Sequence, residues 1–394
     1  MTYITIIIIG IILSLSFDGK EKNNKNTYVN LYIIIFVVIS AISDNLGADA
    51  YTYRARFDLY IGDFSKENIV SWVLLYGYMP LWTIINETAV ALGCTYSFVQ
   101  TIIAISINSV VGYFVKNNTN YPFITLVIYF LVSYFYMNFE VQREALAIAI
   151  GFVGLINYLN GHRIIYWICI FIATLFHISA ICLFVFPIIP KFKLSWLRLF
   201  LAFCISLFIY IISDYFVKLI PSFGAGSLSD KVEGYASATV TIFGFLLHTI
   251  RRLFVPFVSY LIMRKIYPQK YEYIDRFIPF YLCFSILSCA IPGTFRLINY
   301  MMPVSILIMS DLIVALAHRT IKGVKVLLAI FVFLLYTNHN ISHMFTYYPM
   351  SGYHRYDLYI PYSTIFDDYE DYSYRDWIHK EALDGKTQDN ERKK

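Results

Sequence analysis

Apolar runs of about 15 to 25 residues recur along almost the whole chain, and they constrain its fold more than any other feature. A helix of this length can cross the hydrocarbon core of a bilayer. Hydrophobic residues make up 58% of the chain and charged residues only 14%, so a soluble protein of 394 residues would lack the polar side chains to cover its surface. We therefore predict an all-α fold, that of a polytopic helical membrane protein.

The expected number of membrane segments is about 11 to 13, including short or re-entrant helices. The ambiguous run is Ile164–Ile189, which is long for one span and has His177 at its middle. Two short arms meeting at His177, with the N-terminus outside, put the basic clusters on the cytoplasmic side, as the positive-inside rule requires. One span would put the last three clusters outside, so two arms are predicted. The candidate spans are Tyr3–Phe17, Tyr28–Ser43, Phe98–Val115, Pro122–Met137, Glu144–Leu159, Ile164–Phe176, Ile178–Ile189, Trp196–Ile212, Val240–Ile262, Phe277–Ile291, Leu297–Leu316 and Gly323–Thr337.

This topology predicts one transmembrane domain over residues 1–341, with external loops at 44–97 and 213–239, followed by a polar, tyrosine-rich tail at 342–394. The net charge of +5 comes from short basic clusters between apolar runs, which is not the pattern of a nucleic-acid-binding protein. The six cysteines are scattered without metal-ligand spacing. We therefore predict neither a metal nor any other cofactor.

Ionisable side chains within or against the bilayer are costly and usually have a function. In the predicted topology all but one pair lie at or near the outer half of the membrane, which indicates one external cavity. Several arginines suit a ligand with phosphate groups, because the guanidinium pairs with two oxygens and stays charged. These residues are Asp49, Arg54, Arg56, Glu140, Arg143, Glu144, His177, His248 and Arg296, with the pair Arg251 and Arg252 in mid-span.

Most of these candidates have a structural alternative. Arg143 could contact a ligand, or it could anchor a helix and pair with Glu140 or Glu144. Asp49 could take a proton from a sugar hydroxyl, or it could cap a helix that begins at Ala50. His177 could act as a base or donate to phosphate, or it could be a buried histidine at a helix break.

The remaining candidates lie beside these residues or in other spans. Arg251 and Arg252 are adjacent, so they point to different sides of a helix and one of them could face the cavity. Arg296 follows a helix break and precedes Tyr300, a further candidate ligand contact. Tyr53, close to Asp49, could stack on a sugar ring.

Six short motifs, given in chain order at the end of this paragraph, resemble those of the EpsG family. Its members are membrane proteins of bacterial exopolysaccharide and capsule loci and are grouped with Wzy-type polysaccharide polymerases. The resemblance covers roughly residues 30–365. One departure is that the family usually has Arg-Gln where this chain has Arg143-Glu144. Another is that an asparagine or serine of the family, a few residues before the arginine, is Asn138 here. The motifs are Gly47-Ala-Asp49 with Tyr53, Tyr78-Met-Pro-Leu-Trp82, Arg143-Glu-Ala-Leu-Ala147, the segment Ile172–Ala180, the segment Phe295–Tyr300, and Tyr359-Ile-Pro-Tyr362.

The resemblance implies a multi-pass polymerase of the bacterial inner membrane, similar in architecture to GT-C glycosyltransferases. Such an enzyme would transfer a glycan from undecaprenyl pyrophosphate onto the next lipid-linked repeat unit during exopolysaccharide, capsule or O-antigen synthesis. Asp49 or His177 would be the base, and Arg143, Arg296 and Arg54 would stabilise the departing pyrophosphate without a metal. The partners implied are the lipid-linked oligosaccharide, the bilayer, a chain-length regulator and other polysaccharide-assembly membrane proteins, with no nucleic acid.

Three other functions remain open at this point. A flippase or exporter of lipid-linked oligosaccharide would line a through-path with arginines, whereas the polar residues here cluster on the outer side. A membrane O-acetyltransferase needs a cytoplasmic acyl-donor site, for which only His162-Arg163 and His318-Arg319 are available. A structural partner of a capsule-assembly machine is the third alternative.

Overall fold

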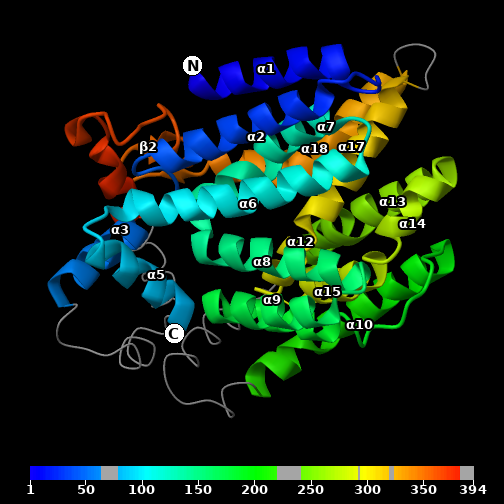
Figure 1. The fold of residues 1–394 in the computed structure, drawn as a ribbon. Coiled ribbons are helices and arrows are strands. Elements are labelled where there is room, and N and C mark those ends of the chain that lie inside the picture. Colours follow the sequence, from blue (N-terminus) through cyan, green and yellow to red (C-terminus); the bar gives the residue numbers. More distant parts are fainter. Residues whose placement is uncertain (64–78, 220–240, 292, 319–323, 382–394) are drawn as a thin grey trace. The chain divides into compact units, whose positions relative to one another are not determined.

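Helices make up most of residues 1–63, 79–219, 241–291, 293–318 and 324–381, which the computed structural model describes (Figure 1). This confirms the predicted all-α class. Among these residues the exception is a short antiparallel hairpin of β1 (Tyr347–Tyr348) and β2 (Tyr353–His354). Most of the predicted loop 213–239, Tyr78 of the second motif, and Arg319 lie outside the described residues.

The chain divides into two compact units, each described by itself. The first comprises residues 1–150, 175–177 and 337–394. Its elements are α1 (Thr2–Phe17), α2 (Lys25–Ile42), α3 (Ala50–Asp63), α5 (Pro80–Ala91), α6 (Tyr96–Asn118), α7 (Pro122–Tyr129), the π-helical turns η1 (Phe130–Tyr134) and η2 (Tyr136–Glu140), the first half of α8 (Gln142–Leu159), the end of α18 (Val324–Met344), the β-hairpin, and the 3₁₀ turns η6 (Arg355–Leu358) and η7 (Tyr369–Tyr372).

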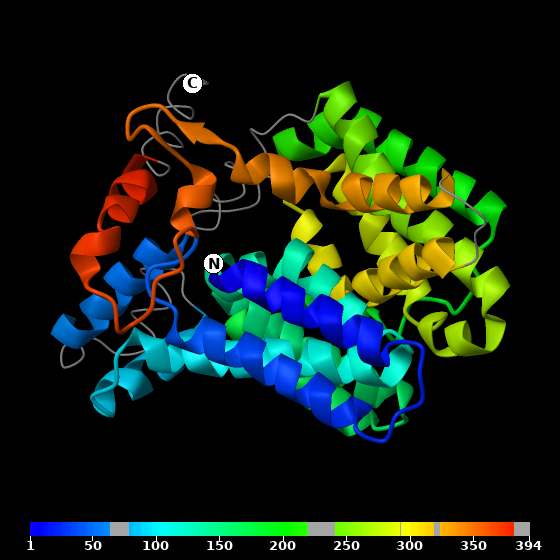
Figure 2. The same ribbon diagram turned by 90° about the horizontal axis from the view of Figure 1, so that it is seen from above.

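Close packing of α2 against α6 forms much of the first unit (Figure 2). The buried positions of α6 recur every three or four residues, as expected for a helix with one face in a core. Gly112 permits the close approach, because a Cβ atom there would lie 2.2 Å from Cδ1 of Ile33. Small residues serve the same purpose at helix contacts in membranes, where backbones pack closely.

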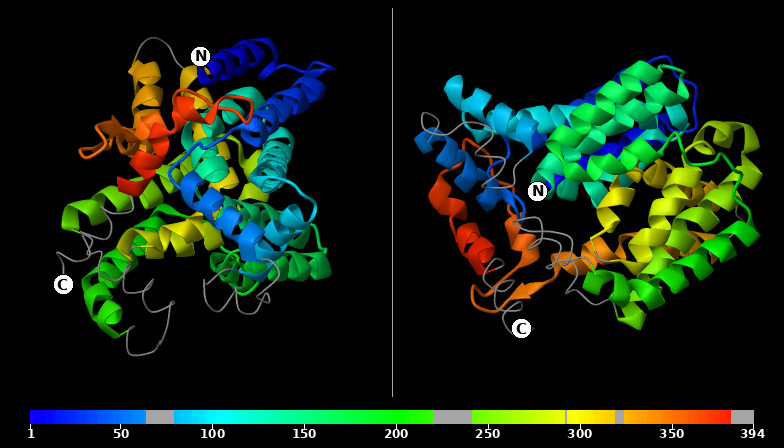
Figure 3. Two further views of the ribbon diagram at one scale, coloured as in Figure 1. Left: turned by 90° about the vertical axis from the view of Figure 1, so that its left-hand side faces the viewer. Right: turned by 90° about the horizontal axis from the view of Figure 1, so that it is seen from below.

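The second unit comprises residues 151–174 and 178–336. In it α10 packs against α15 (Figure 3). The Ser206 hydroxyl donates to the Ile286 carbonyl at 3.1 Å. Ion pairs between Arg264 and Asp275 at 2.8 Å and between Lys270 and Asp311 at 2.6 Å fix the corner between α13, α14 and α17. The elements are the rest of α8, α9 (Arg163–Phe176), the 3₁₀ helix η3 (Ile178–Val185), α10 (Trp196–Leu219), α12 (Ile242–Thr249), the π-helical turn η5 (Ile250–Phe254), α13 (Val255–Ile266), α14 (Pro268–Ile274), α15 (Ile278–Ala290), α16 (Phe295–Asn299), α17 (Met302–His318) and the start of α18.

Several helices have the length and composition of membrane spans. Four described helices qualify, namely Lys25–Ile42, Tyr96–Asn118, Trp196–Ser213 and Ile242–Ile266, and the bent pair α14 and α15 would make a fifth. Large apolar side chains are exposed along them, for example Phe208 and Ile211 of α10. The chain is therefore a polytopic membrane protein. The predicted 11 to 13 segments, the domain division at residue 341 and the GT-C-like architecture stay predictions.

The predicted break at His177 is confirmed. Helix α9 ends at Phe176, and the second arm is a 3₁₀ helix from Ile178 to Val185 instead of a full α-helix. In an α-helix the Leu183 carbonyl would accept the N–H of residue 187, but residue 187 is a proline and has no N–H. The carbonyl accepts hydrogen bonds from the Tyr166 hydroxyl and the Phe186 N–H instead.

The predicted single span Leu297–Leu316 is wrong in one respect, because the chain breaks at Tyr300 and Met301 between α16 and α17. Pro303 explains the break, since it has no N–H to bond to the Asn299 carbonyl and would clash with it in a continuous helix.

Candidate functional site

The loop between α2 and α3 carries the first motif and lies over the end of η2. Gly47 has a φ of +94°, and a Cβ atom there would lie 2.7 Å from the Phe139 carbonyl oxygen. Only glycine therefore fits, because the backbone is left-handed and the space is filled by another backbone. The Gly47 N–H donates to the Leu358 carbonyl at 3.1 Å. Asp49 follows at the start of α3, which begins at Ala50, the helix start considered in the structural alternative for Asp49.

Residues 345–381, here called the C-terminal segment, close around this loop instead of projecting as a tail. The Asp44 N–H donates to the Ser363 carbonyl at 3.0 Å, and the Ile365 N–H donates to the Ile42 carbonyl at 2.9 Å. Within the C-terminal segment Arg375 is fully buried, and its guanidinium donates to the Asp357, Asn45 and Pro361 carbonyls. The loop that carries Asp49 is thus fixed from the far end of the chain.

His379 holds the residue next to Asp49. Its Nδ1–H donates to the Ala48 carbonyl at 2.8 Å, and its ring stacks on Tyr51. Burial lowers the pKa of His379 to about 4, so the ring is neutral at physiological pH. Its Nε2 has no hydrogen-bond partner among the described residues, so a proton there would be buried without an acceptor. The sequence analysis missed Arg375 and His379, because neither lies in an apolar run or a motif.

The next part of the site is an ion pair immediately before α8. Arg355 and Glu140 are 2.7 Å apart, and their side chains keep only 10% and 12% of their exposure. The Tyr359 hydroxyl of the last motif donates to the same carboxylate. Burial acts against the charge of Arg355, but Glu140 outweighs it and raises the pKa of the guanidinium. Glu140, one of the partners considered for Arg143, thus has Arg355 as an ion-pair partner.

Arg143 and Glu144 lie in the first turn of α8, as predicted, with Arg143 half-buried and Glu144 buried. Arg143 and Asp49 are both near enough for their charges to act on the Tyr96 hydroxyl, on which burial has the larger effect. Tyr53 stacks on Tyr96 and packs edge-on against Trp82 of the second motif. Four of the six motifs therefore meet in the first unit.

A chain of buried amides supports this cluster from α6 and η2. The Tyr96 hydroxyl donates to the Gln142 side chain, whose amide donates to the Asn138 carbonyl at 3.1 Å. The Asn138 side chain accepts from Asn108 at 2.9 Å, and Asn108 accepts from the Tyr129 hydroxyl at 2.9 Å. The two π-helical turns in residues 130–140 lie in the same stretch, and such turns occur often at functional sites. Apart from Asn138, the sequence analysis missed this chain, because single amides in apolar runs carry no pattern.

Arg54 and Arg56, two predicted ligand contacts, lie on α3. Arg54 forms an ion pair with Asp44 at 2.6 Å, which ties α3 to the end of α2. Its side chain still keeps 39% of its exposure. Arg56 is half-buried. Arg54 therefore has an evident structural role in addition to the predicted one.

The second unit carries the other predicted arginines. Arg251 and Arg252 lie in the π-helical turn η5. The Arg252 guanidinium donates to the Ser288 carbonyl and lies over the Phe295 ring at 5.5 Å. Phe295 precedes Arg296 in α16, so Arg252 contacts the fifth motif. Tyr300 is buried, and its hydroxyl is 2.9 Å from that of Ser179 in the fourth motif.

The predicted residues thus fall into two groups. Asp49, Tyr53, Arg54, Arg56, Arg143, Glu144 and His177 belong to the first unit, and Arg251, Arg252, Arg296 and Tyr300 belong to the second. His177 is half-buried in the break after α9. One cavity common to both groups stays a prediction.

A model of the EpsG family matches residues 26–364, a range that contains all six motifs. No curated protein and no solved structure matches the chain.

Proposed function

Because the chain belongs to the EpsG family, we propose that it is a polysaccharide polymerase that joins lipid-linked oligosaccharide repeat units at the external face of the bacterial inner membrane. The donor would be a glycan on undecaprenyl pyrophosphate, and the acceptor would be the next lipid-linked unit. An acceptor hydroxyl oxygen forms the glycosidic bond to the anomeric carbon, the bond from that carbon to the pyrophosphate breaks, and the hydroxyl proton passes to a base. The product serves exopolysaccharide, capsule or O-antigen synthesis.

The meeting of four motifs in the first unit carries this proposal. Pyrophosphate is already a good leaving group, so the protein has to position the reactants, accept a proton and stabilise the charge that develops. Asp49, which is within electrostatic range of Tyr96, supplies a carboxylate for the proton. Arg143, also within electrostatic range of Tyr96, supplies a permanent positive charge on the first turn of a helix whose dipole favours anions.

The surroundings of these residues suit the same chemistry. The loop before Asp49 is held by Gly47 and by the C-terminal segment, and Arg143 follows the Glu140–Arg355 pair by three residues. When the catalytic groups are already held in place, less of the substrate's binding energy is needed to order them. Arg252 and Arg296 stay predicted ligand contacts, and His177 is the alternative base. A chain-length regulator and other assembly proteins are the proposed partners.

Sizing the lipid-linked glycan after deletion of the gene tests the function. Single repeat units that accumulate at the external face support a polymerase. Units trapped on the cytoplasmic side would indicate a flippase instead. Full-length polymer that lacks acetyl groups would indicate an O-acetyltransferase.

Two variants test the site. Arg143→Ala should abolish chain growth at an unchanged protein level, because the charge beside Tyr96 is lost. Arg163→Ala is the matched control, since Arg163 is exposed at the start of α9, outside all six motifs, and should leave chain growth unchanged. Wild-type polymer from Arg143→Ala would remove Arg143 from the mechanism.

A further inference from the structure

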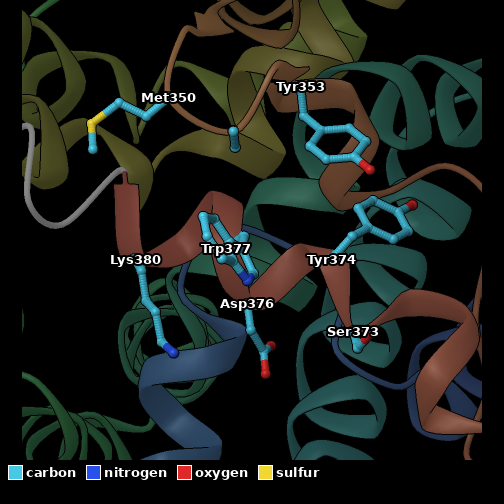
Figure 4. A pocket seen from close by; sticks show the side chains of 8 residues that line it. Met350, Tyr353, Ser373, Tyr374, Asp376, Trp377 and Lys380 are labelled. Carbon is cyan, nitrogen blue, oxygen red and sulfur yellow. The ribbon is translucent and has the colours of Figure 1, made fainter.

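A hollow of about 530 Å³ lies in the C-terminal segment, on residues that the proposed mechanism does not use (Figure 4). This volume is within the range of small-molecule sites, about 300–1,000 Å³. One wall comes from the turn between β1 and β2, and the other from a helix at residues 374–381. The lining residues are Met350, Ser351, Tyr353, Ser373, Tyr374, Asp376, Trp377 and Lys380.

The two walls are tied together by hydrogen bonds. The Glu381 carboxylate accepts the N–H groups of Met350 and Ser351 at 2.7 and 2.6 Å, which joins the helix to the hairpin turn. Desolvation acts to raise the pKa of Glu381, but the hydrogen bonds from Ser351 and Met350 outweigh it and lower the pKa. The rings of Tyr353 and Tyr374 stack across the two walls with centroids 4.9 Å apart. The two walls are therefore held together by contacts within the protein.

The helix at residues 374–381 has one anchored face and one open face. Arg375 and His379, four residues apart, are buried against the loop before α3. Trp377 and Lys380 lie on the other side, and Trp377 is 68% exposed. Figure 4 shows the Trp377 indole between Lys380 and Tyr374. The indole is therefore accessible on the face of the helix that lines the hollow.

The chemistry of the lining residues fits a carbohydrate. A sugar ring presents C–H groups on its faces, which pack on aromatic rings, and hydroxyls at its edge, which both donate and accept hydrogen bonds. Trp377, Tyr353 and Tyr374 supply the rings, while the carboxylate of Asp376 accepts and the ammonium of Lys380 donates. A membrane surface fits less well, because anionic lipids attract clusters of basic residues and this hollow contains one lysine beside one aspartate.

The position of the hollow relates it to the candidate active site. The Asn45 side chain donates to the Asp376 carboxylate at 3.0 Å, and His379 on the same helix binds the Ala48 carbonyl. The helix that forms one wall of the hollow is thus fixed to the loop that ends in Asp49. We propose that the hollow is a subsite that holds sugar residues of the glycan being extended, away from the reacting end. This inference rests on the proposed function and adds a place where the polymer is retained between transfer steps.

Oligosaccharide binding to the purified full-length protein in detergent tests the subsite without any turnover. The probe is the polysaccharide of the host strain, cut to short oligosaccharides by partial hydrolysis, with affinity measured by titration calorimetry. Trp377→Ala should weaken binding at least fivefold, because the face of the sugar would lose the largest aromatic ring that lines the hollow. Trp377→Phe should restore part of the affinity. Phe366→Ala is the matched control, since Phe366 is 79% exposed in the same C-terminal segment but does not line the hollow.

Chain length in cells gives a second measurement. Trp377→Ala should shorten the polymer without abolishing it, whereas Arg143→Ala should abolish chain growth and leave oligosaccharide binding unchanged. Equal affinity of wild type and Trp377→Ala would overturn the subsite. The subsite would also be overturned if Trp377→Ala lost binding to phosphatidylglycerol vesicles but bound the oligosaccharide as wild type does. The hollow would then be a membrane contact. If the gene deletion leaves the polymer intact, the proposed function fails, and the calorimetry still decides whether the hollow binds glycan.

Discussion

The ion pair between Glu140 and Arg355 should hold the C-terminal segment against the start of α8, and Glu140→Gln should loosen it. Both side chains are about nine-tenths buried, and removal of one partner from a buried pair typically costs about 3–5 kcal/mol. The glutamine oxygen can still accept the Tyr359 hydroxyl, so we expect a smaller cost than this range, about 2–3 kcal/mol. This corresponds to roughly a 30- to 150-fold increase in local opening.

Hydrogen exchange of peptides from residues 345–381 is the suitable assay. Thermal unfolding is less suitable, because a chain with two compact units need not unfold in one step. Exchange in the C-terminal segment of Glu140→Gln should accelerate by the stated factor at neutral pH. The double variant Glu140→Gln with Arg355→Met should recover at least half of the protection, because no buried charge is left unpaired.

Asp367→Asn is the matched control. Its carboxylate accepts only local bonds from Thr364 and lies in an exposed part of the same segment, so exchange elsewhere in the segment should be unchanged. Unchanged exchange in Glu140→Gln would refute the reasoning. A double variant as loose as the single one would also refute it, because the loss would then not come from an unpaired arginine.

Three further predictions concern the same region. The pKa of His379 falls from 6.5 to about 4 on folding, so the unfolded segment binds a proton more readily. The C-terminal segment should therefore be fully stable above pH 6.5 and lose stability toward pH 4, by about 2 kcal/mol at pH 5. Hydrogen exchange in residues 345–381 should show this pH dependence, which should vanish in His379→Gln. Gly47→Ala should displace the Asp49 loop and abolish polymer formation, which polymer yield would show. The matched control is Gly93→Ala, because Gly93 has a φ of +68° and no neighbour within 4 Å of the new Cβ. This control should only lower thermal stability, by about 1–2 kcal/mol. Tyr96→Phe keeps the ring that stacks on Tyr53 but removes the hydroxyl that donates to the buried Gln142 oxygen. It should therefore lower thermal stability by about 1–3 kcal/mol. An unchanged melting temperature would contradict the role assigned to the amide chain.

The local features of the chain were predictable from its sequence. The apolar runs predicted a helical membrane protein, the start of α3 at Ala50 and of α8 before Glu144 followed from polar residues at the ends of runs, and the break at His177 followed from run length and charge. These features are local because a segment in lipid must satisfy its backbone hydrogen bonds within itself. The six motifs, taken in order, also indicated the family that the comparison confirms.

The partners of the charged residues were decided by tertiary structure. Glu140 pairs with Arg355, which lies 215 residues away, and the Asp49 loop is held by Arg375 and His379 from the other end of the chain. A pairing of this kind leaves no trace in sequence spacing, because any of the nearby cations could neutralise the same carboxylate equally well. Packing selects among them, since a charge is stable in a buried position only where its partner's geometry compensates for the lost water.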